Sequence, residues 1–344
     1  MPRQLSPGWF RLFLATVVVL FHTSKIVFFG FWAVFVFFVL SGYWIAEMYR
    51  EKYSKIENAF VTFEMSRFLR IFPTFLAISF LAVAVIVSGY GDLKPESLKD
   101  VGWLARSFCL FGSSAVPTRL IETQWSLDIE LQFYLFFPLL FSVIAKPTNL
   151  GWLLCGGYLG VLFVIFGLVD SLALYLPFFG AGVLLSQTKW KAGLSTLVGS
   201  FVVIVLVFLF IVVYPESRRS VLAFGNVQVF RHDVTRMVDV ILTFAALPFV
   251  AINVRNRETK LGFHAGNLSF PLYLVHWVAL GPYVALYGHL PLWSRLPYFV
   301  AYLVVCLVVS LIIYIFIDRP IDGWRRNKIR HSRKTHTLSG VANG

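Results

Sequence analysis

The sequence predicts an all-α protein, a polytopic membrane helix bundle of about ten transmembrane helices with both termini in the cytoplasm. Hydrophobic residues fill 58% of its 344 positions and charged residues only 14%, whereas soluble globular proteins have about 45–50% apolar and about 25% charged residues. The mean hydropathy is +0.76, and the apolar residues gather in long stretches. This composition excludes an ordinary soluble enzyme and indicates a protein that lies in the lipid bilayer.

A helix needs roughly 20 apolar residues to cross a bilayer core ~30 Å thick, and ten stretches approach this length. They are 9–24, 31–49, 70–91, 125–145, 150–168, 170–187, 195–214, 236–253, 268–287 and 296–317. The partly apolar segment 100–124 is expected to be a short re-entrant or interfacial piece. An even number of spans leaves both termini on one side, and placing that side in the cytoplasm collects most lysines and arginines there, in agreement with the positive-inside rule.

The chain shows no internal repeat and no linker, so we expect one membrane-embedded domain over residues 1–320. The segment 321–344 is basic and polar, and we expect a disordered cytoplasmic tail. The net charge of +13 comes without zinc-finger spacing or an RNA-binding signature, so the predicted partner is the lipid bilayer and no nucleic acid. No metal site is predicted. The expected location is the cell membrane, multi-pass, and the inner membrane if the source is bacterial.

Two ionisable residues of the first span are candidates for function, because such residues cost about 2.5–3.5 kcal/mol each within a membrane. Arg11 and His22 lie eleven residues apart, which places them on one helix face, ~16 Å apart along the axis. This arrangement suits a channel with a cation at its mouth and a proton-transfer group at its end. The alternatives are a snorkelling arginine and a hydrogen-bonded interfacial histidine.

A second pair of cations, Arg67 and Arg70, precedes the third span. Their spacing of three residues places both guanidiniums on one helix face, where they can bind phosphate or carboxylate. The alternative is a contact with anionic lipid headgroups, which is common for arginines at the membrane surface.

A polar stripe crosses the fourth span, where Ser126, Glu130 and Tyr134 recur every four residues. Glu130 is expected about a turn and a half below the outer surface, where a carboxylate needs a partner such as the imidazole of His22. The alternative is a structural hydrogen bond to a neighbouring helix.

The ninth span carries a third polar set, because Ser269, Tyr273 and His276 follow one another at steps of four and three residues and share a helix face. His276 falls near the middle of the membrane, which is an unusual place for an imidazole. An interhelical hydrogen bond is the alternative to a functional role.

Taken together, these motifs resemble the acyltransferase-3 family of integral-membrane O-acyltransferases. Three places depart from the family's usual pattern. Leu131 stands where a second acidic residue is common, Asp318 stands where glutamate is usual, and residues 32–34 (Trp-Ala-Val) stand where Gly-x-Asp is common. The matching positions are Arg11 with His22 and the segments 37–43, 67–73, 125–134, 269–276 and 318–320.

The resemblance implies an O-acyltransferase that uses a cytoplasmic acyl-CoA, with acetyl-CoA as the expected donor and succinyl-CoA as an alternative. The implied acceptor is a hydroxyl of a glycan or lipid-linked sugar. The implied site has three groups of residues: Arg11, Arg67 and Arg70 for the donor, His22 and Glu130 for catalysis, and Ser126, Ser269, Tyr273 and His276 for the acceptor or the developing oxyanion.

Two other classes of protein share this composition. A secondary transporter also has many spans and buried ionisable residues, but the sequence lacks a two-fold repeat and paired interrupted spans. A non-catalytic subunit of a polysaccharide-assembly complex is the other alternative. Release of acetyl groups from CoA by the purified protein distinguishes the enzyme from both.

Overall fold

A computed structural model describes residues 5–23, 29–56, 58–91, 93, 95–144, 172–188, 190–213 and 235–328. Within these ranges all regular secondary structure is helical, as the sequence predicts. The chain forms two compact units, and the boundaries between them fall inside α2 (Gly30–Met48), α5 (Gln124–Ile144) and α11 (Lys260–Tyr287).

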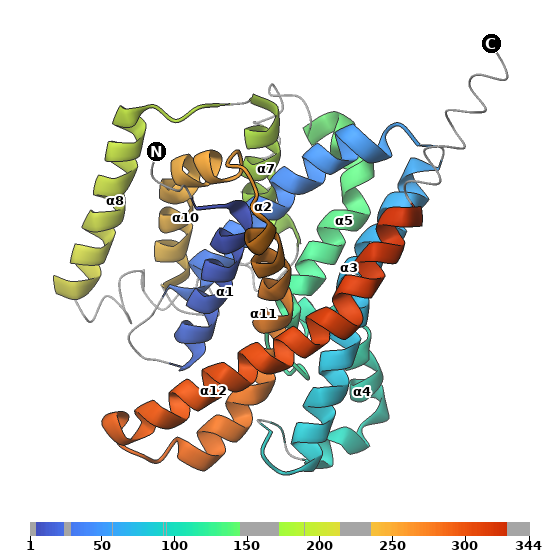
Figure 1. Ribbon diagram of the computed structural model, residues 1–344, viewed down its shortest axis with the longest axis vertical. Helices are drawn as coiled ribbons and strands as arrows, with labels where there is room; N and C mark the ends of the chain where they lie inside the picture. The colour runs from blue at the N-terminus through green and yellow to red at the C-terminus, as the bar shows by residue number, and fades with distance from the viewer. Residues whose placement is uncertain are drawn as a thin grey trace, which may run out of the picture. The chain divides into compact units, whose positions relative to one another are not determined.

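The first unit comprises Met1–Ala46 and Leu140–Ser269. Besides its parts of α2, α5 and α11, it contains four described helices, and α8 packs along α10 (Figure 1). The four are α1 (Pro7–Thr23), α7 (Leu172–Thr188), α8 (Leu194–Val213) and α10 (Thr235–Asn253).

Small residues allow α2 and α7 to cross closely in the first unit. A Cβ added at Gly182 of α7 would overlap the carbonyl oxygen of Val39 on α2, and one added at Gly42 of α2 would overlap that of Phe179. Backbones approach this closely only where a side chain is missing, a common device of helices packed in membranes. Aromatic rings fill the adjoining interface, and Phe35 stacks on Phe178 at a centroid distance of 4.5 Å.

The second unit comprises Glu47–Leu139 and Phe270–Gly344. Its long helix is α3 (Ala59–Val87), and α4 (Val101–Phe108) is a short helix capped by Asp100, whose carboxylate accepts the Trp103 backbone N–H. After α12 (Leu292–Ile313), a π-helical turn, Tyr314–Asp318, packs against α3 (Figure 1).

Nine of the ten predicted spans coincide with described helices, and the tenth, 150–168, lies outside the described residues. Two helices begin earlier than predicted: α3 at Ala59 rather than near 70, and α11 at Lys260 rather than near 268. Polar and charged residues lie within the first three turns of both helices, among them Glu64 and Arg67 on α3 and Lys260 on α11. They break the apolar stretch but do not interrupt helical hydrogen bonding. The segment 100–124 contains α4, in keeping with the short piece expected there.

Four described helices are long and apolar enough to cross a membrane: Gly30–Tyr53, Ala59–Val87, Lys260–Tyr287 and Trp293–Lys328. Other apolar helices are shorter, so the total of ten crossings and the cytoplasmic placement of the termini stay predictions. Large apolar side chains are exposed on these helices, among them Phe201 at 60% and Phe80 at 60%. An apolar exterior of this kind suits contact with lipid.

The crossing of α2 and α7 gives a direct test of the packing. Gly182→Ala should lower the free energy of unfolding by about 1–3 kcal/mol, because the new methyl group must displace backbone. Gly199→Ala is the matched control, since a Cβ there meets nothing within 4 Å and alanine favours the helix by roughly 1 kcal/mol. Thermal unfolding in detergent measures both variants, and equal stabilities would contradict the proposed crossing.

Candidate active site

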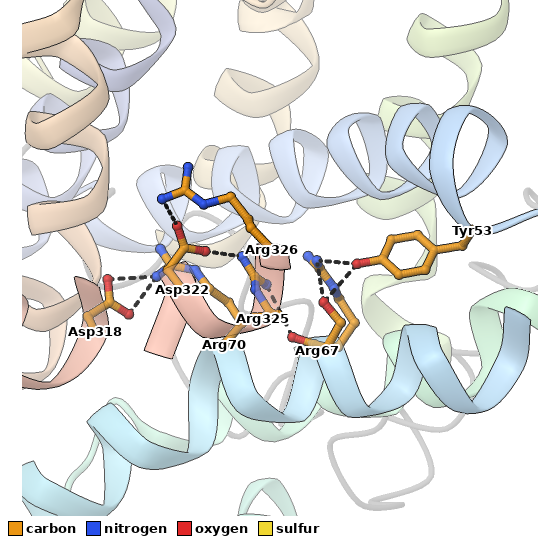
Figure 2. Close-up of polar contacts among 8 residues, drawn as sticks. Tyr53, Arg67, Arg70, Asp318, Asp322, Arg325 and Arg326 are labelled. Atoms are coloured by element: carbon orange, nitrogen blue, oxygen red, sulfur yellow. Dashed lines mark hydrogen bonds and ion pairs between the residues drawn. The ribbon is translucent and has the colours of Figure 1, made fainter. Parts of the chain in front are cut away.

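An ion pair in the second unit joins α3 to the turn that follows α12. Nη1 of Arg70 donates to both carboxylate oxygens of Asp318, at 2.6 and 2.8 Å (Figure 2). The Asp318 side chain is only 5% exposed, and the guanidinium also lies over the ring of Phe270. The sequence predicts that Arg70 binds the donor, but within the protein its charge is already countered by a carboxylate.

Arg67, one turn earlier on α3, has different surroundings. It is 5% exposed, and its Nη2 donates to the hydroxyls of Tyr53 and Ser66 at 3.3 and 3.4 Å. The rings of Phe63 and Tyr134 lie 5.7 and 5.9 Å from the guanidinium carbon. Among the described residues no carboxylate is hydrogen-bonded to Arg67. The sequence predicts the same donor-binding role for Arg67 and Arg70, but only Arg70 is hydrogen-bonded to a carboxylate.

Two more arginines, Arg325 and Arg326, lie on the helical segment that follows α12, and their contacts extend the polar network of Arg67 and Arg70. Arg325 donates to the carbonyl oxygen of Ser66 at 3.1 Å and to the carboxylate of Asp322, which also pairs with Arg326 at 2.7 Å (Figure 2). The helix continues to Lys328, so the first residues of the predicted tail 321–344 are ordered through these contacts. Residues 329–344 lie outside the described part of the chain.

We call the four guanidiniums of Arg67, Arg70, Arg325 and Arg326, with the carboxylates of Asp318 and Asp322, the arginine cluster. Glu64 lies one turn before Arg67 and interacts with it electrostatically. Even when Glu64 is counted, positive groups outnumber negative ones. The buried Nε atoms of Arg67 and Arg325 have no hydrogen-bond partner among the described residues, and such groups are rarely left unsatisfied.

Two π-helical turns bring partner residues to α3. The turn Tyr49–Tyr53 follows α2, and the turn Tyr314–Asp318 follows α12. A π-helical turn closes its hydrogen bonds five residues apart, so it rotates later side chains around the helix axis relative to a regular α-helix. The last residue of the first turn contacts Arg67, and the last residue of the second pairs with Arg70.

Ser126 and Tyr273, which the sequence places on different spans, are joined by a hydrogen bond of 2.7 Å between their oxygens. Ser126 Oγ donates to the carbonyl oxygen of Thr123 at 2.9 Å, so Tyr273 must be the donor to Ser126. Both side chains are buried. Both hydroxyl protons are therefore used within the protein, and an oxyanion would have to redirect one of them.

Two other predicted residues of the second unit also have protein partners. Tyr134 donates to Oε1 of Glu130, which confirms the polar stripe on α5. His276 is fully buried, and its Nδ1 lies 3.3 Å from the carbonyl oxygen of Leu272. The hydroxyl of Tyr302 donates to the His276 carbonyl oxygen.

The remaining predicted residues belong to the first unit. The guanidinium of Arg11 lies so close to Gly266 that a Cβ there would overlap it, which fixes the cation where α1 meets the start of α11. The His22 ring is half-buried against Phe21, edge to face at 4.9 Å, and Ser269 donates to the Gly266 carbonyl oxygen. Since His22 and Glu130 belong to different units, their predicted pairing stays a prediction.

Two residues that shape the second unit, Asp128 and Arg325, were not predicted from the sequence as functional residues. Asp128, on α5, is completely buried and accepts the backbone N–H groups of Gly112 and Ser114 at 3.0 and 2.7 Å, which ties the loop before α5 to that helix. An aspartate two residues after Ser126, inside an apolar span, was the available signal. Arg325 gave no such signal, because a basic tail is expected to carry arginines.

The chain belongs to the family described as an acyltransferase domain, whose profile matches residues 5–315. With its long apolar helices, this makes it a membrane protein of that family. It is similar to acyltransferase MdmB of Streptomyces mycarofaciens, 31% identical over 137 residues, which are 36% of this chain and 32% of that protein. It is also similar to peptidoglycan O-acetyltransferase OatA of Listeria monocytogenes, 32% identical over 132 residues, which are 34% of this chain and 20% of that protein.

The matched region thus spans about a third of the first relative and a fifth of the second. No solved structure matches the chain.

The Arg70–Asp318 pair predicts a loss of stability when one partner is removed. Arg70→Gln should lower the free energy of unfolding by about 3–5 kcal/mol, because the buried carboxylate loses its counter-charge. Adding Asp318→Asn should restore part of this loss. Arg326→Gln is the control, since the Arg326 side chain is 56% exposed and an exposed pair contributes about 0–1 kcal/mol. Equal losses in Arg70→Gln and Arg326→Gln would contradict the structural role of the pair.

Proposed function

We propose that the protein is a membrane O-acyltransferase that moves an acyl group, with acetyl expected, from cytoplasmic acyl-CoA to a hydroxyl of a sugar. The acceptor belongs to a cell-envelope or exported glycan or its lipid-linked precursor. Membership of the acyltransferase-domain family supports the reaction class. The observation that carries the donor is the pair of buried Nε atoms, of Arg67 and Arg325, that have no acceptor among the described residues.

The arginine cluster has the chemistry of a phosphate site. Burying a cation without a counter-ion is costly, and a guanidinium offers paired N–H donors that match phosphate oxygens. Arg67 and Arg325 have buried Nε atoms for which the described residues provide no acceptor. The phosphates of CoA would supply acceptors for these N–H groups. Arg70 then serves mainly to hold Asp318, and Arg11 is the proposed cation of the first unit.

The proposed chemistry uses His22 as a general base. Its imidazole takes the proton from the acceptor hydroxyl while the hydroxyl oxygen attacks the thioester carbonyl carbon. The C–S bond then breaks, and the CoA thiolate takes the proton from the imidazolium. Glu130 would orient the ring and stabilise its charged form, as the carboxylate of a catalytic triad does. Ser126, Ser269, Tyr273 and His276 are the proposed acceptor or oxyanion contacts.

One relative supports the acceptor class by its name, and the other supports only the reaction class. OatA is a peptidoglycan O-acetyltransferase, so an acetyl ester on a glycan hydroxyl is its product. MdmB is an acyltransferase. Because the similarity covers only part of each protein, the glycan acceptor of this chain is our inference.

Membranes that contain the protein and their own glycans test the proposal. With radiolabelled acetyl-CoA, label should appear in the glycan as a base-labile ester. His22→Ala should lower this transfer by roughly 10²–10⁴-fold, the usual value of general-base help. His289→Ala is the control, because that histidine is exposed and lies on a loop. Transfer by His22→Ala close to that of the wild type would rule out the proposed base.

A further inference from the structure

The second unit contains a cavity of about 160 Å³ that none of the proposed site residues lines. We call it the outer cavity. Three stretches of chain enclose it: the end of α3, the loop before α5, and α11 beyond Tyr273. Its most informative lining residues are Ile86, Thr118, Arg119, Glu122 and Trp277.

The outer cavity and the arginine cluster lie at opposite ends of α3. Arg67 belongs to the cluster, and Ile86 lines the cavity. These residues are nineteen positions apart, which is about 28 Å along a helix and close to the ~30 Å thickness of the bilayer core. A membrane-spanning α3, which its length and composition allow, would place the cavity toward the membrane side opposite to the cluster.

The polar groups of the outer cavity are held rigidly. Arg119 donates from Nε to the carbonyl oxygen of Ser113 at 2.6 Å and from Nη2 to that of Ser114 at 3.1 Å. Its Nη1 pairs with Oε1 of Glu122 at 2.9 Å. The Asp128 carboxylate holds the same loop by its N–H groups. The guanidinium is therefore fixed, while the Glu122 side chain remains 42% exposed.

The lining has the character of a sugar-binding site. One wall is the indole of Trp277, whose face suits the C–H groups of a sugar ring, and Ile86 adds an apolar surface. The Glu122 carboxylate accepts hydrogen bonds from hydroxyls. Arg119 and Glu122 cancel one another's charge, so the cavity favours neither an anion nor a cation. These features select a neutral polyhydroxylated ligand.

The cavity also adjoins the hydrogen-bonded pair of Ser126 and Tyr273. Trp277 follows Tyr273 by one helical turn, and Glu122 precedes Ser126 by four residues. A sugar ring bound against Trp277 would therefore lie near the hydrogen-bonded hydroxyls of Ser126 and Tyr273.

We propose that the outer cavity binds the acceptor as a neutral sugar, with Trp277 as its platform and Glu122 as its hydroxyl acceptor. This inference rests on the proposed O-acyltransferase function. It assigns donor and acceptor to opposite ends of α3.

The test uses the same membranes and radiolabelled acetyl-CoA, with free sugars as competitors of glycan labelling. Methyl glucoside is the neutral probe, glucuronic acid the anionic one and glucosamine the cationic one. Methyl glucoside should inhibit wild-type labelling at a concentration at least fivefold lower than either charged sugar. Glu122→Gln leaves the Arg119 charge uncompensated, so glucuronic acid should gain at least fivefold in potency.

Variants of Trp277 complete the design. Trp277→Ala should lower glycan labelling at least fivefold without changing the acetyl-CoA concentration for half-maximal rate, and Trp277→Phe should restore most of it. Trp293→Ala, at a tryptophan that is 82% exposed on α12, should behave like the wild type. Equal losses in Trp277→Ala and Trp293→Ala, equal inhibition by all three sugars, or a changed requirement for acetyl-CoA in Trp277→Ala would overturn the assignment. Absence of labelling by the wild type would instead refute the proposed function.

Discussion

A guanidinium buried in an apolar helical unit must be neutralised where it lies, and the second unit is built around this constraint. Arg70 has Asp318 as its counter-ion, and Asp322 serves Arg325 and Arg326. These contacts hold the segment after α12 against α3 and keep it helical to Lys328. Arg67 differs from its neighbours, because hydroxyls and aromatic rings surround it in place of a hydrogen-bonded carboxylate.

This division explains how one motif can serve both stability and binding. An arginine that is already paired with a carboxylate gains little from a ligand phosphate, whereas a buried arginine without one gains a counter-charge. Arg70 secures the fold, whereas Arg67 has no hydrogen-bonded carboxylate among the described residues. Arg325 is paired with Asp322 but keeps a buried Nε without an acceptor there. In our account, the donor binds at this end of α3, and the acceptor approaches from the other end, where the local charge sums to zero.

The sequence predicts the helices well, because long apolar stretches report directly on the membrane. The span 9–24 corresponds closely to α1, and 296–317 corresponds to α12 and its π-helical turn. The starts of α3 and α11 were missed, because polar and charged residues in their first three turns break the apolar stretch. An apolar pattern does not distinguish a π-helical turn from an α-helical one, so the approach of Tyr53 to Arg67 could not be foreseen.

The sequence identified candidate residues for the site but not the residues that they contact. The pair of Arg70 and Asp318 joins residues 248 positions apart, and the bond between Ser126 and Tyr273 joins residues 147 apart. No spacing rule on a single helix reaches that far. Spacing did predict that Glu130 and Tyr134 share a helix face, and the structure adds a hydrogen bond between them.

Direct binding of two donors in lipid nanodiscs tests the central claim most sharply. Acetyl-CoA carries the nucleotide phosphates, and acetyl-pantetheine carries the same thioester without them. By calorimetry the wild type should bind acetyl-CoA at least tenfold more tightly, and Arg67→Gln should abolish most of this preference, whereas Arg106→Gln on α4 should keep it. Equal affinity of the wild type for the two donors, or an unchanged preference in Arg67→Gln, would contradict a donor site built from the arginine cluster.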